Sequence, residues 1–172
     1  PNANITAQAA LSVEMGGGVQ KILFQKNEQK RMPVASLTKL MTALVVMENY
    51  DLNQKITIST NAMAQEGEQG VLEFGQEFSV KSLLYTTLME SNNRSAYALS
   101  ELMGVDTFIG LMNDNTKQLG LDDTHFHDAT GLDARSYSTA KDIARLSGYL
   151  FENYPLFKEI ISLKEYDVNM YD

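Results

Sequence analysis

Two apolar-rich stretches within the first 25 residues flank a run of glycines. Residues 9–15 and 19–25 are rich in apolar side chains, and Gly16, Gly17 and Gly18 lie between them. Two such stretches joined by a short glycine connection are typical of an antiparallel β-hairpin. We therefore expect a strand pair in this part of the chain.

A helical pattern follows the hairpin. Pro33 can open a helix, and the segment from there to about Asn49 is apolar on nearly every side at about 100° per residue. A helix that is apolar all round is buried in a protein core. Between Arg31 and Glu48, Lys39 is the only formally charged residue, so we expect its amine to lie in a mostly dry interior.

The remaining pattern is mainly helical. A short strand is expected at 55–58, and the alternation of residues 163–170 predicts a half-exposed strand. Thr139 and Asp142 have the spacing of a capping box, and Pro155 ends the helix that they open. We expect helices after Ser59 (a brief one), after Ser79 to about Met89, from about Arg94 to Met103, from an Asp106 cap to Gly120, and from Thr139 to about Asn153.

This order of elements predicts an α/β (α+β) fold in a single domain, residues 1–172. We expect the hairpin and the buried helix in residues 1–50 and a helical subdomain in about 51–140. A return helix and the first strand of a further sheet half should occupy about 141–172. So few strands leave the apolar helix with little cover, so we expect a fragment, a cleaved form or a split protein whose partner segment is missing.

Composition narrows the possible functions. The 172 residues, 44% apolar and 21% charged, are typical of a folded domain, and the net charge of −8 argues against a nucleic-acid partner. The absence of cysteine excludes disulfides, zinc–thiolate sites and thiol catalysis. No apolar run approaches the ~20 residues of a membrane span, and no basic-then-apolar leader is present, so we expect any signal peptide to have been removed or left out.

A serine one helical turn before the buried lysine suggests nucleophilic catalysis. Burial lowers the pKa of a lysine and makes a neutral amine available, so Lys39 could act as the base for the hydroxyl of Ser36. The start of a helix also offers unpaired N–H groups for a developing oxyanion. The alternative is that Ser36 only caps the helix and Lys39 extends to the surface.

Ser91-Asn92-Asn93 supplies a second motif between two expected helices. In a tight turn, the Ser91 hydroxyl and the Asn93 amide can point to the same side, where one relays a proton and the other binds a substrate carbonyl. The alternative is a helix end followed by an asparagine cap.

With both motifs in this order, the sequence resembles the serine D-alanyl-D-alanine carboxypeptidases, the low-molecular-mass penicillin-binding proteins, which are related to class A β-lactamases. The resemblance covers most of residues 9–172. It implies the penicillin-binding/β-lactamase-like transpeptidase fold, an antiparallel sheet with helices plus an all-helical subdomain, truncated here after the helical part. Four stretches carry it: ASLTKLMTAL, FGQEFSVKSLLYTTLMESNNRSAYALSE, THFHDATGLD and YSTAKDIARLSGYLFENYP.

The resemblance implies a role for each matching residue. Ser36 would be the acylated nucleophile and Lys39 its base, Ser91 would pass protons to the leaving group, and Asn93 would hold the substrate amide. The implied substrate is the D-Ala-D-Ala end of a peptidoglycan stem peptide, with β-lactams as covalent inhibitors and with no metal or cofactor. The implied location is exported, in the cell envelope.

The sequence departs from the family pattern in three places. Asp128 stands where the family usually has Asn, and Arg94 stands where it most often has Asp. The third family motif, Lys-Thr-Gly on a strand, is absent from the chain. Because that strand binds the substrate carboxylate and supplies the second oxyanion N–H in the family, we expect a missing C-terminal segment to carry it.

Other functions fit fewer residues. A class A β-lactamase would carry a Glu-x-x-Leu-Asn type loop after the second motif, and nothing after Asn93 matches one. A non-catalytic module that binds wall peptides or β-lactams is the alternative from another class. His125 and His127 with nearby aspartates could in principle hold a metal, but the spacing is nonspecific and a surface turn is the preferred interpretation.

Overall fold

The computed structural model describes residues 5–16, 19–67, 70 and 72–167 of the chain. It shows an α+β fold in which helices predominate. The elements are β1 (Ala10–Gly16), β2 (Val19–Lys26), β3 (Met32–Pro33), the 3-10 turn η1 (Ala35–Leu37), α1 (Thr38–Asn49), β4 (Lys55–Thr57), α2 (Thr60–Met63), β5 (Glu77–Ser79), α3 (Val80–Met89), α4 (Asn93–Glu101), α5 (Val105–Gln118), β6 (Tyr137–Ser138), α6 (Ala140–Asn153) and α7 (Pro155–Ser162).

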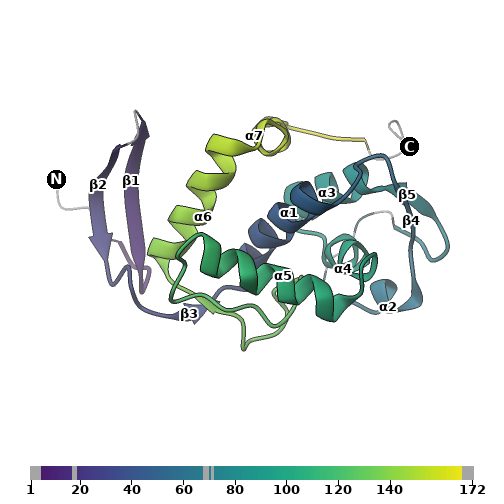
Figure 1. The fold of residues 1–172 in the computed structure, drawn as a ribbon, viewed down its shortest axis with the longest axis horizontal. Helices are drawn as coiled ribbons and strands as arrows, with labels where there is room; N and C mark the ends of the chain where they lie inside the picture. The colour runs from purple at the N-terminus through teal and green to yellow at the C-terminus, as the bar shows by residue number, and fades with distance from the viewer. Residues whose placement is uncertain (1–4, 17–18, 68–69, 71, 168–172) are drawn as a thin grey trace.

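Helix α1 lies at the centre of the helical part. It contacts α3, α4, α5 and α6, which surround it in Figure 1. Its apolar side chains Met41, Leu44 and Val45 are fully buried. Thr38 is fully buried as well, and Lys39 is only 3% exposed. The predicted burial of this helix is therefore confirmed, and with it the unusual position of the lysine. The expectation that the helix has little cover is wrong, because helices rather than strands pack around it.

The strands form three separate pairs among the described residues. β1 and β2 make the expected antiparallel hairpin, with a register shift between Ser12 and Val13; the predicted turn at Gly17 and Gly18 lies outside the described residues. The hairpin stands at one end of the molecule, with α6 beside β1 (Figure 1). The pairs β3–β6 and β4–β5 are also antiparallel and short.

Three predicted N-caps are confirmed. The hydroxyls of Ser59, Ser79 and Thr139 accept hydrogen bonds from the backbone N–H three residues later. Such bonds satisfy one of the free N–H groups at a helix start and stabilise a helix by about 1 kcal/mol.

Two predictions about caps are wrong. Gly104, not Asp106, is the N-cap of α5, and Asp106 lies in the first turn, where its charge still interacts favourably with the helix dipole. The capping box at α6 is only half formed. Its carboxylate, Asp142, instead accepts hydrogen bonds from the Asp123 N–H (3.0 Å) and the Thr124 hydroxyl (2.8 Å).

Both prolines used as helix markers have other roles. Pro33 pairs in β3, and α1 begins five residues later, because Ala35 adopts a left-handed φ of 45° that a continuous helix cannot contain. Pro155 opens α7, a helix that the pattern did not predict, at a first position that suits its fixed φ and missing N–H.

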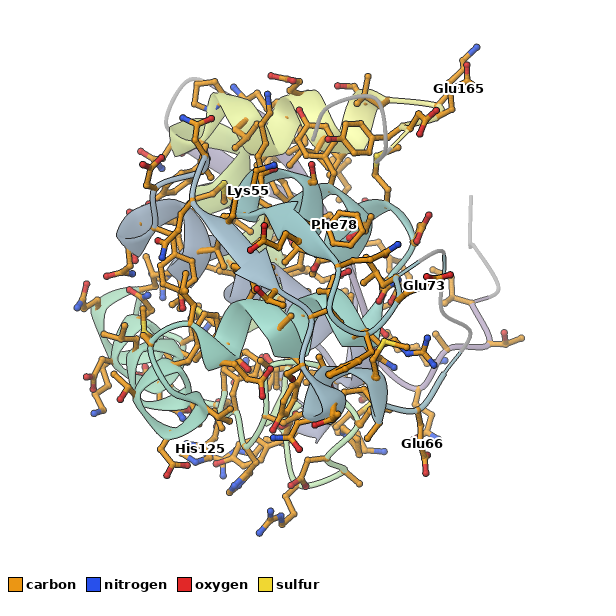
Figure 2. All side chains as sticks on the ribbon, turned by 90° about the vertical axis from the view of Figure 1, so that its right-hand side faces the viewer. Lys55, Glu66, Glu73, Phe78, His125 and Glu165 are labelled. Atoms are coloured by element: carbon orange, nitrogen blue, oxygen red, sulfur yellow. The ribbon has the colours of Figure 1, made fainter. Side chains whose placement is uncertain are left out.

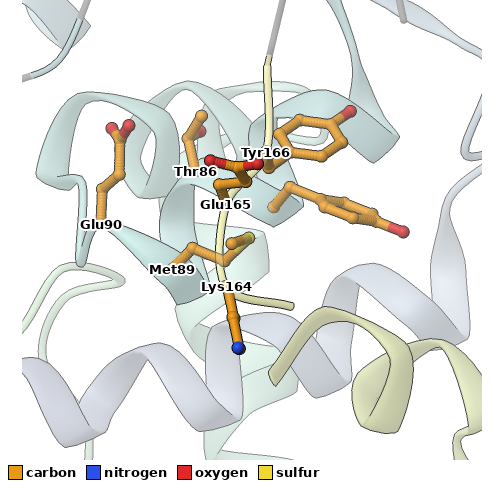
Figure 3. A pocket seen from close by; sticks show the side chains of 7 residues that line it. Thr86, Met89, Glu90, Lys164, Glu165 and Tyr166 are labelled. Atoms are coloured by element: carbon orange, nitrogen blue, oxygen red, sulfur yellow. The ribbon is translucent and has the colours of Figure 1, made fainter. Parts of the chain in front are cut away.

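The predicted tail strand does not form in residues 163–167, and the rest of it lies outside the described residues. Instead, Tyr166 stacks on Tyr85 of α3 at a ring distance of 4.2 Å. The tail and α3 enclose a pocket of about 260 Å³, which is seen from close by in Figure 3. Among the described residues, no helix has both the length and the apolar character needed to cross a bilayer.

Candidate active site

Ser36 lies in the turn η1, immediately before α1. Its side chain is exposed, and so are those of its neighbours Ala35 and Leu37. The φ of 45° at Ala35 is rare for a residue with a Cβ, and such strain is concentrated at functional sites. The strained turn places the serine at the surface while the helix behind it is buried.

Lys39 lies one turn further on and points from the core toward the serine. Its Nζ is 3.2 Å from Ser36 Oγ, 2.6 Å from Asn93 Oδ1 and 2.7 Å from the Thr130 carbonyl oxygen. The structure therefore brings together four groups, one each from η1, α1, α4 and the loop before β6.

These contacts suit a neutral amine as well as an ammonium. A neutral amine has two N–H donors and one lone pair, and two of its neighbours, Asn93 Oδ1 and the Thr130 carbonyl, can only accept. If both N–H groups donate to these oxygens, the lone pair faces the hydroxyl of Ser36. In that arrangement, the lone pair would be placed to accept the serine proton.

The electrostatics of the site favour that state. Burial lowers the pKa of Lys39 to about 8, against an opposing effect of the Asp128 charge. Desolvation penalises the ammonium form, because the apolar core around α1 replaces its hydration. A base that titrates near neutral pH is well matched to proton transfer.

The two ends of the second motif, Ser91 and Asn93, have different contacts. Asn93 Oδ1 contacts Lys39, and Asn93 Nδ2 donates to the Glu66 carbonyl (2.6 Å), which leaves one N–H of that amide. Ser91 has a left-handed φ of 55° and an exposed side chain, and no hydrogen bond of its hydroxyl is found within the described part of the chain. Between them, Asn92 is the N-cap of α4, so the capping interpretation of this segment and the contact with Lys39 hold together.

Sequence reasoning missed the backbone groups that complete this arrangement. The carbonyls of Thr130 and Glu66 hold Lys39 and Asn93, but every residue has a carbonyl, so no side-chain pattern marks them. Gly131 lies so close to Ala35 that an added Cβ would be 1.9 Å from the Ala35 oxygen. The glycine in the THFHDATGLD stretch was the available signal.

The other singled-out residues lie apart from the lysine contacts. The rings of His125 and His127 pack edge to face at 4.7 Å, and no cluster of metal-binding side chains is present among the described residues. Arg94 follows Asn93 in the first turn of α4 and is half-buried. Figure 2 shows Glu66 and His125 toward the end of the molecule opposite to Glu165.

An apolar groove lies beside Leu37, the residue after Ser36, on the side of the hairpin. Its volume is about 380 Å³, and residues of β1, β3, η1 and α6 line it, among them Leu11, Leu37 and Ile143. Leu37, directly after the serine, is 49% exposed. Polar contacts thus hold Lys39 on the helical side, and an open apolar groove lies on the hairpin side of η1.

Comparison by sequence and comparison by structure both find D-alanyl-D-alanine carboxypeptidases. The D-alanyl-D-alanine carboxypeptidase family model matches residues 1–172. The carboxypeptidase DacF of Bacillus subtilis is 33% identical over 168 residues, 93% of this chain and 43% of the relative. A D-alanyl-D-alanine endopeptidase of Escherichia coli is 30% identical over 165 residues, 94% of this chain and 52% of the relative.

A solved structure of a D-alanyl-D-alanine carboxypeptidase from Mycobacterium tuberculosis superposes with a TM-score of 0.88 at 26% identity. The match covers 95% of this chain and 62% of that one. The chain thus spans about half the length of the curated relatives that it matches. It belongs to the D-alanyl-D-alanine carboxypeptidase family of serine peptidases and has the penicillin-binding protein fold.

Proposed function

We propose that this chain is the nucleophile-bearing part of a serine D-alanyl-D-alanine carboxypeptidase that removes the terminal D-alanine from peptidoglycan stem peptides. The observation that carries this proposal is the buried Lys39 amine, 3.2 Å from the exposed hydroxyl of Ser36. Membership of the family supports the substrate and the reaction.

The proposed reaction proceeds through an ester of Ser36. Lys39 takes the hydroxyl proton as Oγ attacks the carbonyl of the penultimate D-alanine, and the Asn93 amide holds the substrate backbone. When the C–N bond breaks, the proton passes to the departing D-alanine amine, with Ser91 as the relay. Water then hydrolyses the ester and frees the shortened peptide.

β-Lactams fit the same proposal. The attack of Ser36 on a β-lactam carbonyl opens the ring, and the ring nitrogen takes the proton but stays attached, so an acylated protein accumulates. A similar protein of known structure, from Haemophilus influenzae, is named penicillin binding protein 5, which supports this expectation.

We further propose that a segment carrying Lys-Thr-Gly completes the site. The apolar groove beside Leu37 and the half-exposed Leu37 itself support an occupant on that side. Peptidoglycan lies outside the cytoplasmic membrane, so the proposed substrate implies an exported protein in the cell envelope.

Intact-mass spectrometry with benzylpenicillin tests the function. We expect a one-to-one adduct on the full-length gene product that is lost in Ser36→Ala and kept in Ser59→Ala, a serine-to-alanine control at the N-cap of α2. The 172-residue chain is measured in parallel. No adduct on the folded full-length protein would refute the proposed nucleophile.

Turnover separates the remaining alternatives. Release of D-alanine from a diacyl-Lys-D-Ala-D-Ala peptide supports the carboxypeptidase, whereas rapid hydrolysis of benzylpenicillin itself would indicate a β-lactamase. Binding without either reaction would indicate a non-catalytic module. Because a relative is named an endopeptidase, a cross-linked dimeric peptide is included as a third substrate.

A further inference from the structure

The turn formed by residues 128–132 contacts both members of the proposed catalytic pair. The Thr130 carbonyl accepts a hydrogen bond from Lys39 Nζ at 2.7 Å. The neighbouring Ala129 carbonyl accepts one from the hydroxyl of Thr42, one turn further along α1, also at 2.7 Å. The position of this turn therefore decides where the lysine amine is held.

The same turn supports the backbone before Ser36. Gly131 has a left-handed φ of 86°, and its Cα lies so close to Ala35 that a Cβ would meet the Ala35 carbonyl oxygen at 1.9 Å and carbon at 2.3 Å. Ala35 is itself in the left-handed region. Strained residues persist only where their surroundings hold them, and the Gly131 backbone packs directly against this one.

One carboxylate organises this turn. Asp128 Oδ2 accepts the N–H groups of Thr130 (3.2 Å), Gly131 (2.8 Å) and Leu132 (2.9 Å) and the Thr130 hydroxyl (2.5 Å). Its other oxygen, Oδ1, accepts the Ser136 hydroxyl at 3.1 Å. Charged acceptors make the stronger hydrogen bonds, so five donors converge on one side chain that fixes the turn.

We propose that Asp128 is a positioning residue of the reaction: its carboxylate holds the turn 128–132 so that Thr130 orients Lys39 and Gly131 supports the backbone of Ser36. This inference rests on the proposed function. The charge of Asp128 also acts on Lys39 directly, since it raises the lysine pKa against the larger lowering effect of burial.

Other charged groups near this network have different partners. Asp133 pairs with Arg135 beyond the turn, and Glu66 contacts Asn93 through its backbone carbonyl. Burial and the Asp128 charge are the two effects that set the pKa of Lys39. A substitution that removes only the charge should therefore be visible in the titration of the lysine.

Two substitutions separate the charge from the hydrogen bonds. In Asp128→Asn, the amide oxygen still accepts the turn N–H groups and Nδ2 can donate to Ser136, so the turn should persist without the charge. In Asp128→Ala, all five hydrogen bonds are lost. Asp123→Asn is the matched control, because Asp123 pairs with Arg31 at the surface and leaves the turn untouched.

The first readout is the acylation rate of the full-length protein by benzylpenicillin across pH. We expect Asp128→Asn to keep its rate at high pH within a few fold and to move the acidic limb of the profile to lower pH. We expect Asp128→Ala to lose at least about tenfold at every pH, and Asp123→Asn to match the unmodified protein. An unchanged rate and profile in both Asp128 variants would overturn the inference.

The second readout does not depend on catalysis. The NMR signal of the lysine Cε in ¹³C-lysine protein, assigned to Lys39 by its loss in Lys39→Met, reports the pKa of the amine directly. We expect a value near 8 that falls in Asp128→Asn and stays unchanged in Asp123→Asn. If the unmodified protein forms no acyl adduct, the proposed function fails while this titration still tests Asp128. An unchanged Lys39 pKa in Asp128→Asn would overturn the effect of the charge.

Discussion

Helix α1 and the hairpin β1–β2 are both rich in apolar residues, yet they differ sharply in burial. Four helices surround α1, and Leu44 at its centre is fully buried. In β2, Ile22 and Leu23 are 56% and 57% exposed. Because neighbours along a strand point to opposite faces, the hairpin presents apolar surface on both of its faces.

This difference explains how the proposed site is assembled. Apart from its contact with Ser36, Lys39 has its polar contacts on the closed helical side, from α4 and from the turn 128–132. The groove beside Leu37 lies on the open side, between the hairpin and α6. The hydrogen bonds of Lys39 to Asn93 and Thr130 thus involve no residue of the hairpin.

The largest expected effect tests the closed side itself. Leu44→Ala should lower the free energy of unfolding by about 2–5 kcal/mol, because it leaves a cavity in a packed core. The same truncation in the hairpin, Leu23→Ala, should change it by less than about 0.5 kcal/mol. Denaturant unfolding measures both. A loss above about 1 kcal/mol for Leu23→Ala would show that the hairpin is packed in solution and would remove the contrast.

The pH dependence of acylation should follow the titration of Lys39, on the closed helical side, and should not depend on the hairpin. With the pKa of Lys39 lowered to about 8, the amine is neutral above that pH and protonated below it. The rate should therefore be half-maximal near pH 8 and fall roughly tenfold per pH unit below it, close to a hundredfold by pH 6.

A rate profile from stopped-flow acylation with a β-lactam checks this prediction. Leu23→Ser, an exposed hairpin variant, should give the same midpoint as the unmodified protein. A midpoint near pH 10 would mean that the lysine is hydrated in solution, which contradicts the burial on which the site depends.

Much of the helical part could be predicted from the sequence, for reasons that the structure makes clear. The lack of charge between Arg31 and Glu48, apart from Lys39, predicts the burial of α1, and serine or threonine caps mark several helix starts. The pair β3–β6 could not be predicted, since two strands of two residues each have no periodicity. The start of α1 was misplaced, because nothing in the sequence marks the left-handed φ of Ala35.

The sequence predicts the side chains of the site but not the backbone groups that hold them. Ser36, Lys39 and Asn93 were predicted, and the structure brings them together; their catalytic roles remain predictions. Asp128 was noticed only as a departure from a family pattern. Its five hydrogen bonds depend on how the loop folds back on itself, which local spacing does not encode.

A pair of glycines separates backbone strain from contact with the site. Gly75 (φ 79°) and Gly131 (φ 86°) have similar left-handed conformations, but a Cβ on Gly75 would meet nothing within 4 Å. Gly75→Ala should therefore cost only the strain of about 1–2 kcal/mol and leave acylation unchanged. Gly131→Ala should cost a further 1–3 kcal/mol or so and slow acylation at least about tenfold.

Unfolding and acylation rates are compared for the two variants. Equal acylation rates in Gly75→Ala and Gly131→Ala would show that the serine does not depend on the turn. Such a result would also weaken the contrast between a closed polar side and an open apolar side, because the closed side would then not position the nucleophile.

The smallest expected effect concerns α6, which joins the two regions. The N–H of Lys141, in its first turn, donates to the Glu28 carbonyl just after β2 at 3.0 Å, and the Thr139 hydroxyl caps the helix at the Asp142 N–H. Thr139→Ala should cost about 1 kcal/mol, as the loss of a cap usually does. If the hairpin is held mainly through α6, amide hydrogen exchange should speed up in β1 and β2 and in the first turn of α6, while α1 keeps its protection.

Ser59→Ala, which removes the cap of α2 instead, should leave hydrogen exchange in the hairpin unchanged. Equal loss of protection in α1 and the hairpin would mean that the two regions unfold as one unit, and that their different burial does not make them separate in stability.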